Sequence, residues 1–135
     1  MRVLLLNPPA PDLVLRDYYC SKTTKASYLN QPIDLLHMSG RLAARWDTRV
    51  LDAVAERLDE RTALARIRSL DPDVVVALVA SVTWTSDRAF LARVAGATGA
   101  RILATGDILR GAGGARLATD QEWLEAVVAD FSRDD

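Results

Sequence analysis

The segment Asp73–Ala80, which reads DVVVALVA, constrains the fold more than any other part of the sequence. Its apolar and β-branched residues follow one another without polar alternation, so a strand formed here would be buried on both faces. Burial on both faces is typical of a central strand in a parallel sheet, which needs helices on each side. The segment therefore predicts an α/β protein.

The remainder of the chain alternates between short apolar runs and segments with helical spacing. Strands are also predicted at 2–6, 48–52, 101–105 and 126–129, and helices at 32–46, at 59–71 with Asp59 as N-cap, around Phe90, Leu91 and Val94 up to Gly99, and at 108–118. Residues 8–30 have no sustained period and contain turn formers and charges, so they are predicted to be a long loop.

Strands that alternate with helices predict a parallel sheet covered on both faces, a three-layer sandwich. With five strands and right-handed crossovers, we expect the flavodoxin-like (Rossmann-type) strand order 2-1-3-4-5 in one domain that spans residues 1–135. Ligands of such sheets bind outside the carboxyl ends of the strands. This rule selects the loops 7–30, 52–58, 81–86 and 106–114.

Composition narrows the class of protein. The net charge is −1. Because the chain has a single cysteine, Cys20, it cannot form an internal disulfide, and it cannot by itself hold an iron–sulfur cluster or a zinc ion bound by four thiolates. Three basic residues, Arg16, Lys22 and Lys25, lie in one segment that is most simply a solvated loop. The sequence has no basic stripe interleaved with aromatic residues, so we expect no nucleic-acid partner. No apolar run is long enough to span a membrane, so we expect a cytoplasmic protein without a membrane partner.

Several familiar ligands of this architecture are excluded by the loops. Asn7-Pro8-Pro9 follows the first strand where a dinucleotide fingerprint or the phosphate loop of a flavodoxin would stand, and no P-loop is present. A response regulator needs an aspartate after the third strand and a lysine after the fifth. Here the third strand ends at Ala80-Ser81, and no lysine follows Lys25.

Polar residues, most of them uncharged, remain at the predicted strand ends. Ser81, Thr83, Thr85 and Ser86 surround Trp84, while Asp52, Gly106 and Asp107 end neighbouring strands. Hydroxyls and main-chain groups beside one aromatic ring suit a large neutral ligand with amide edges. They supply no nucleophile with its base, because the only histidine, His37, lies within a predicted helix, so no catalytic residue is assigned.

Simpler roles stay open for these residues. The hydroxyls of Ser81, Thr83 and Ser86 are equally suited to satisfying a helix N-terminus. Trp84 fits a core position, although its place directly after a strand end favours the rim, and Gly106 fits an ordinary turn.

Five segments, taken in order, resemble the N-terminal cobalamin (B12)-binding domain of B12-dependent radical SAM enzymes. They are RVLLLNPP at the start, residues 31–42 with QPIDLL and GRL, VLDAVAE at 50–56, PDVVVALVASVTW at 72–84 followed by Asp87 and Phe90, and GARILATGD at 99–107. The resemblance implies a domain that holds cobalamin over the carboxyl ends of its strands, with the nucleotide tail in the cleft at the sheet edge. Matched residue by residue, it assigns the cofactor-binding loops to Asn7, Pro8, Asp52, Ala53, Ser81, Val82, Thr83, Trp84, Gly106 and Asp107.

Two departures qualify what the resemblance implies. The methionine-synthase type of B12 domain has D-x-H-x-x-G after its first strand, with the histidine on cobalt, and this chain has no histidine there. The C-x-x-x-C-x-x-C motif that holds the [4Fe–4S] cluster for S-adenosylmethionine cleavage is also absent. The chain is therefore expected to act with a radical SAM barrel domain, in cis or in trans. The alternative is a degenerate B12-type domain that serves as a docking or regulatory module.

Overall fold

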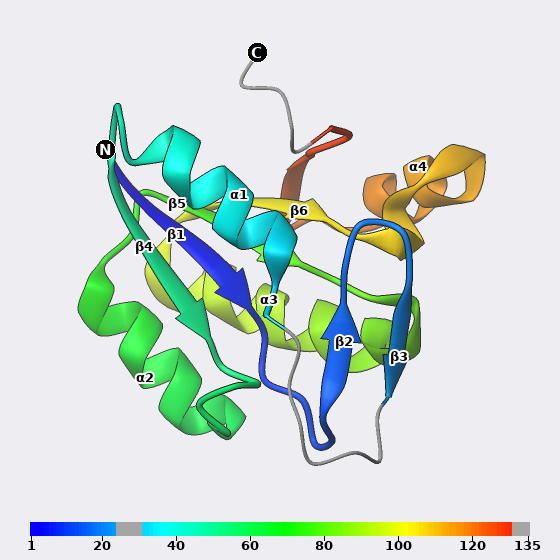
Figure 1. Cartoon of the computed structure of the whole chain (residues 1–135), viewed down its shortest axis with the longest axis horizontal. Helices are drawn as coiled ribbons and strands as arrows, with labels where there is room; N and C mark the ends of the chain where they lie inside the picture. Colours follow the sequence, from blue (N-terminus) through cyan, green and yellow to red (C-terminus); the bar gives the residue numbers. More distant parts are fainter. Residues whose placement is uncertain (24–30, 131–135) are drawn as a thin grey trace.

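The computed structural model describes residues 1–23 and 31–130 of the chain (Figure 1). The elements are β1 (Arg2–Asn7), β2 (Val14–Arg16), β3 (Ser21–Thr23), α1 (Ile33–Leu42), β4 (Asp47–Asp52), α2 (Glu60–Leu70), β5 (Val74–Leu78), the 3-10 turn η1 (Ser81–Thr83), α3 (Trp84–Thr98), β6 (Arg101–Thr105), the 3-10 turn η2 (Asp107–Leu109), α4 (Gly111–Thr119) and β7 (Leu124–Val127).

Five of the strands form one parallel sheet in the order β4-β1-β5-β6-β7. When only the five strands of this sheet are numbered along the chain, the order is the predicted 2-1-3-4-5, so the flavodoxin-like topology is confirmed. The pairing of β6 with β7 shifts by one residue after Ile102, which leaves Glu125 as an extra residue in β7. The order of the strands reverses between β1 and β5, the point where ligands of such sheets usually bind.

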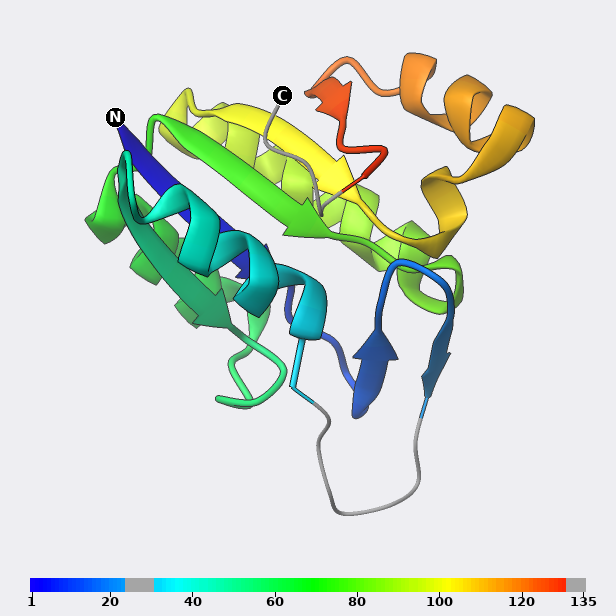
Figure 2. The same cartoon turned by 45° about the horizontal axis from the view of Figure 1, so that its top comes forward.

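Helices cover both faces of the sheet. In Figure 2, α1 lies over one face, above β1 and β4, and α2 and α3 lie behind the other. Two apolar clusters correspond to these layers. The larger joins α2 and α3 to side chains such as Leu4, Val75 and Ile102, and the smaller joins α1 to side chains such as Leu5 and Val76. Every residue of β5 is buried, as its apolar sequence predicts.

The predicted helix signals act as expected where they are strongest. The Asp59 carboxylate accepts a hydrogen bond of 2.7 Å from the backbone N–H of Thr62 and begins α2. Gly99 ends α3 in the left-handed region at φ +69°. The sequence alone predicts these capping roles for both residues, and both predictions are confirmed.

The largest difference from prediction falls in the segment 8–30. The expected loop contains an antiparallel hairpin, β2–β3, of three residue pairs. No sequence pattern indicates this hairpin, because β3 exposes Lys22 and Thr23 and apolar alternation is therefore absent. Residues 24–30, which include Lys25, lie outside the part of the chain that the structure describes.

Smaller differences concern the ends of elements. The first helix ends at Leu42 rather than Trp46, and the backbone N–H of Trp46 turns back to the Leu42 carbonyl so that the Trp46 ring packs on the smaller cluster. The last strand is Leu124–Val127 rather than 126–129, and the helix predicted at 108–118 is divided into η2 and α4. Within the described residues no helix is long and apolar enough to cross a membrane.

Candidate functional site

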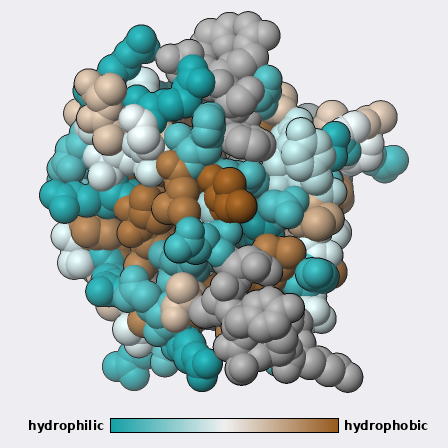
Figure 3. Space-filling view, viewed as in Figure 1, coloured by the Kyte–Doolittle hydropathy of each residue, from teal (hydrophilic) through white to brown (hydrophobic). Residues whose placement is uncertain are grey.

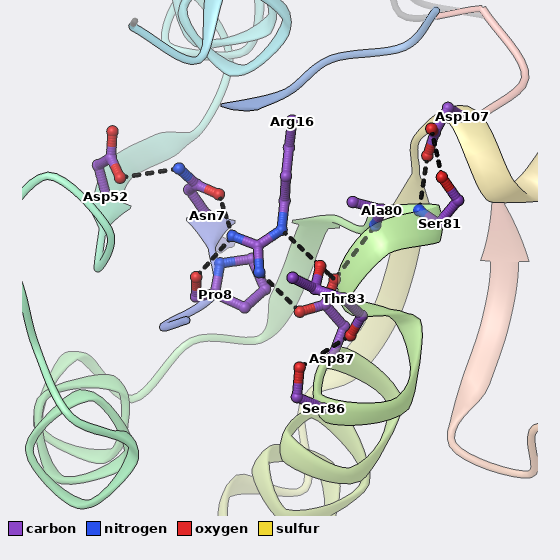
Figure 4. Close-up of polar contacts among 10 residues, drawn as sticks. All are labelled: Asn7, Pro8, Arg16, Asp52, Ala80, Ser81, Thr83, Ser86, Asp87 and Asp107. Atoms are coloured by element: carbon purple, nitrogen blue, oxygen red, sulfur yellow. Dashed lines mark hydrogen bonds and ion pairs between the residues drawn. The ribbon is translucent and has the colours of Figure 1, made fainter. Parts of the chain in front are cut away.

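A buried arginine stands at the point where the strand order reverses. Arg16 is the last residue of β2, and its guanidinium lies between the ends of β1 and β5 (Figure 4). On the β1 side, Nη1 donates to Asn7 Oδ1 and to the Pro8 carbonyl, both at 2.8 Å. On the β5 side, Nε donates to Thr83 Oγ1 at 3.3 Å and Nη2 to Asp87 Oδ1 at 2.7 Å. The guanidinium therefore fills the crevice in which a ligand of this fold would be expected.

The Arg16–Asp87 pair is shielded from water, since both side chains are 0 % exposed. The second oxygen of Asp87 accepts from the Thr83 hydroxyl at 2.7 Å and from the backbone N–H of Ala80 at 3.1 Å. Burial raises the pKa of Asp87, and the charge of Arg16 opposes that rise. The expectation that Arg16 lies in a solvated loop is wrong, because the hairpin turns its side chain inward to meet a buried carboxylate.

The residues matched to the cofactor-binding loops after β1 and β4 lie together. Asn7 Nδ2 donates to Asp52 Oδ1 at 2.8 Å, which links the ends of the two strands. The same Asp52 oxygen accepts from the backbone N–H of Ala55 at 3.0 Å, so it also shapes the turn after β4. Ala53 is buried in the larger apolar cluster. These contacts are made within the protein, and they give Asn7 and Asp52 a structural role.

A second polar group joins the ends of β5 and β6 to the hairpin. Asp107 accepts from the backbone N–H of Ser81 at 2.9 Å and from its hydroxyl at 2.8 Å. The Ser21 hydroxyl of β3 donates to the same carboxylate at 2.7 Å and lies 2.9 Å from the Ser81 oxygen. Ser81 is exposed, so this group, unlike the Arg16 crevice, lies at the surface of the strand ends.

The contacts of Thr83, Ser86 and Trp84 bear on the alternatives that the sequence leaves open for them. Thr83 occupies the N-cap position but makes no capping hydrogen bond with its side chain, because its hydroxyl is directed to Asp87. Ser86 donates to the Thr83 carbonyl. Trp84 packs against the larger apolar cluster and against Trp123, with ring centroids 6.5 Å apart, so its main contacts are with the core. Val82 is exposed.

Gly106 lies where β6 ends, in a backbone conformation with φ +142°. A Cβ atom at this position would lie 1.8 Å from the carbonyl oxygen of Val79. Only glycine fits so close to the neighbouring strand, and the simple turn role left open by the sequence is therefore sufficient to explain it.

A cleft of about 250 Å³ opens beside Gly106, and we call it the edge cleft. Its lining is Tyr18, Gly106, Leu109, Arg110, Gly111, Val127, Val128 and Ala129. It lies at the β6–β7 side of the molecule, where η2 and α4 meet the end of β7. Its volume is below the roughly 300–1,000 Å³ of pockets that enclose a whole small ligand, so it suits one part of a larger molecule.

One charged residue stands among the aromatic rings of the hairpin turn. The Arg110 guanidinium lies 4.7 Å from the ring centroid of Tyr18 and 4.9 Å from that of Tyr19, within the range of cation–π contacts. The Tyr18 hydroxyl donates to the Ala129 carbonyl, which closes one side of the edge cleft. Arg110 thus places a positive charge at the wall of an otherwise neutral cleft.

Sequence reasoning missed the ion pair between Arg16 and Asp87. A signal for Asp87 existed, because it shares one face of α3 with Phe90, Leu91 and Val94 at helical spacing, and a carboxylate on an apolar face needs a partner. No comparable signal marks Arg16. Tyr18 and Arg110 were also unassigned, since the edge cleft forms only when the hairpin meets η2.

The described part of the site offers hydrogen-bonding groups and apolar side chains. No group of three or more metal-ligating side chains is found in residues 1–23 and 31–130. His37 lies on α1 with its side chain exposed. A hydrogen bond from its thiol to Asp17 raises the pKa of Cys20.

Comparisons with known proteins provide no assignment. No family model matches the chain, and no curated protein and no solved structure is similar enough to match it. Sheet topology and site geometry together support a parallel five-stranded α/β domain with flavodoxin-like order.

Proposed function

We propose that the chain is a cobalamin-binding module that presents the corrin at the carboxyl ends of β5 and β6 to a radical SAM barrel domain. The observation that supports this most directly is the edge cleft beside Gly106, at the sheet edge where the resemblance places the nucleotide tail. The cleft is of a size for one ring system, and Arg110 stands at its wall for the phosphate that joins the tail to the corrin.

The residues present fit such a ligand in part. Leu109, Val127 and Val128 offer apolar contact to a planar base, and the hydroxyls of Ser21 and Ser81 offer partners for the corrin amides. Since the only histidine lies on α1, the proposal assigns no protein ligand to cobalt. When bound, cobalamin would supply a cobalt-held methyl group or an electron. The barrel, its [4Fe–4S] cluster and S-adenosylmethionine would belong to another domain or protein.

The test is direct binding of aquocobalamin to the purified chain, measured by isothermal titration and by the absorbance that remains after desalting. Cobinamide, which has the corrin but no nucleotide tail, serves as the second ligand. We expect cobalamin to bind and cobinamide to bind more weakly. Arg110→Gln should reduce the difference between them, while Arg66→Gln, on α2 and paired with Glu56, should not. Absence of binding by both ligands refutes the proposal.

A docking module is the second candidate, and one surface feature favours it. Ile33 and Leu36 on α1 and Val50 on β4 expose their apolar side chains, and the space-filling view shows a hydrophobic area over these elements (Figure 3). Exposed apolar patches of this kind are typical of interaction surfaces. If the chain binds no corrinoid, Ile33→Ser with Leu36→Ser tests this candidate by its effect on co-purification with a radical SAM protein.

A further inference from the structure

The crevice filled by Arg16 has the properties of a preformed receptor. Every group that faces the guanidinium is an acceptor: an amide oxygen, a carbonyl, a hydroxyl and a carboxylate. The acceptors are also oriented by contacts that do not involve Arg16. Asp87 is held by Ala80 and Thr83, and Asn7 is held by Asp52. Without Arg16 the crevice would keep its shape and would favour N–H donors over anions.

The hairpin that supplies Arg16 is attached mainly by polar contacts. Val14 is buried but belongs to neither apolar cluster of the sheet. Besides Arg16, the contacts that tie the hairpin to the rest of the described chain include the Ser21 hydroxyl, bonds from the Tyr18 backbone N–H to Asp34 and from its hydroxyl to Ala129, and the Arg110 guanidinium over the rings of Tyr18 and Tyr19. Segments with few buried apolar contacts open at a lower free energy than the core they cover. The hairpin is therefore suited to detach while the sheet stays folded.

We infer that the crevice between β1 and β5 is a binding site for N–H donor groups of a ligand, which Arg16 fills in the closed state and vacates when the β2–β3 hairpin detaches. The acceptor set selects primary amides, ammonium groups and guanidinium groups. If the ligand is cobalamin, its amide side chains are the donors. Only the identification of the ligand as cobalamin rests on the proposed function.

Chemical rescue tests the receptor directly. Arg16→Ala removes the guanidinium and leaves the acceptors, so methylguanidinium at millimolar concentration should raise the melting temperature of this variant by a few degrees. If the variant is unfolded alone, the same compound should restore its native circular dichroism. Tetramethylammonium, a cation without N–H groups, should do neither. Wild type, whose crevice Arg16 fills in the closed state, should respond far less than Arg16→Ala, and Arg66→Ala should respond no more than wild type. Failure to rescue, or an equal response in Arg66→Ala, overturns the inference.

Hydrogen exchange followed by mass spectrometry tests the opening of the hairpin in the wild-type chain. Amides of residues 14–23 should exchange at least ten-fold faster than those of β1 and β5. Exchange of both regions at one common rate means that the hairpin opens only with the whole fold, and overturns the inference. Local opening and chemical rescue without cobalamin binding would refute the proposed function and leave the receptor intact, so the two failures are distinguishable.

Discussion

Replacing Gly106 by alanine tests how closely β5 and β6 approach where the candidate site begins. The added Cβ would lie 1.8 Å from the Val79 carbonyl oxygen, and contacts below 3.0 Å are essentially never seen for real Cβ atoms. The backbone must therefore move by at least the difference, 1.2 Å. Such a shift disturbs the 2.8 Å hydrogen bond from the Val79 N–H to the Thr105 carbonyl, which lies beside it.

Two costs combine in the Gly106→Ala variant. A strained backbone conformation costs about 1–3 kcal/mol, and a buried N–H without a partner costs about 1–3 kcal/mol. We therefore expect the free energy of unfolding to fall by about 2–6 kcal/mol, a large part of the roughly 5–15 kcal/mol that stabilises a typical domain. Urea unfolding followed by circular dichroism measures this loss.

Two other glycines provide matched controls for Gly106. Gly99 also has a positive φ, but a Cβ added there would have no atom within 4 Å, so Gly99→Ala should cost only the left-handed penalty of about 1–2 kcal/mol. Gly96 lies inside α3 with the same free space, and Gly96→Ala should stabilise by up to about 1 kcal/mol. A loss at Gly106 no greater than that at Gly99 would refute the close approach of the two strands.

Three further measurements test other parts of the structure. Asp59→Ala removes the N-cap of α2 and should lower the melting temperature, while Asp59→Ser, which keeps an acceptor, should recover much of the loss. Hydrogen bonds from the backbone and side chain of Arg2 lower the pKa of Asp73. The carboxylate therefore stabilises the fold above the unfolded pKa of about 3.9, and this contribution is lost as the pH falls through the lower pKa of the native state. Asp73→Asn should weaken the acid dependence of unfolding. In α4, Gly113→Ala should be neutral or stabilising, whereas Gly114→Ala, whose Cβ would lie 2.2 Å from the Leu109 carbonyl, should destabilise the wall of the edge cleft in thermal unfolding.

Sequence reasoning succeeded where local patterns and the global fold require the same residues. The continuous apolar run at β5, the cap at Asp59 and the glycine at 99 each have one sufficient physical explanation, and the strand order follows from right-handed crossovers. It failed at Arg16, because an arginine in a polar segment is ordinarily hydrated. Only the three-dimensional meeting of the hairpin with α3 makes its burial favourable, and that meeting joins residues separated by 71 positions.

The candidate site shows the same limit in another form. Asn7, Asp52, Thr83 and Asp107 were correctly placed at one edge of the sheet, since the carboxyl ends of parallel strands meet there. Their hydrogen-bond partners were not predictable, because those partners come from other strand ends, such as Asp52 for Asn7 and Ser81 for Asp107. The edge cleft depends on Tyr18 and Arg110, which no periodic pattern connects.

The extra residue Glu125 in β7 has a consequence for the behaviour of the protein in concentrated solution. A regular outer strand offers its free N–H and C=O groups to the sheet of another molecule, which is a common start of aggregation. The bulge at Glu125 interrupts that row, and the ion pair between Glu125 and Arg101 places charges beside it. The opposite outer strand, β4, exposes Asp47 and Arg49 along its length. Both borders of the sheet therefore discourage growth by strand addition.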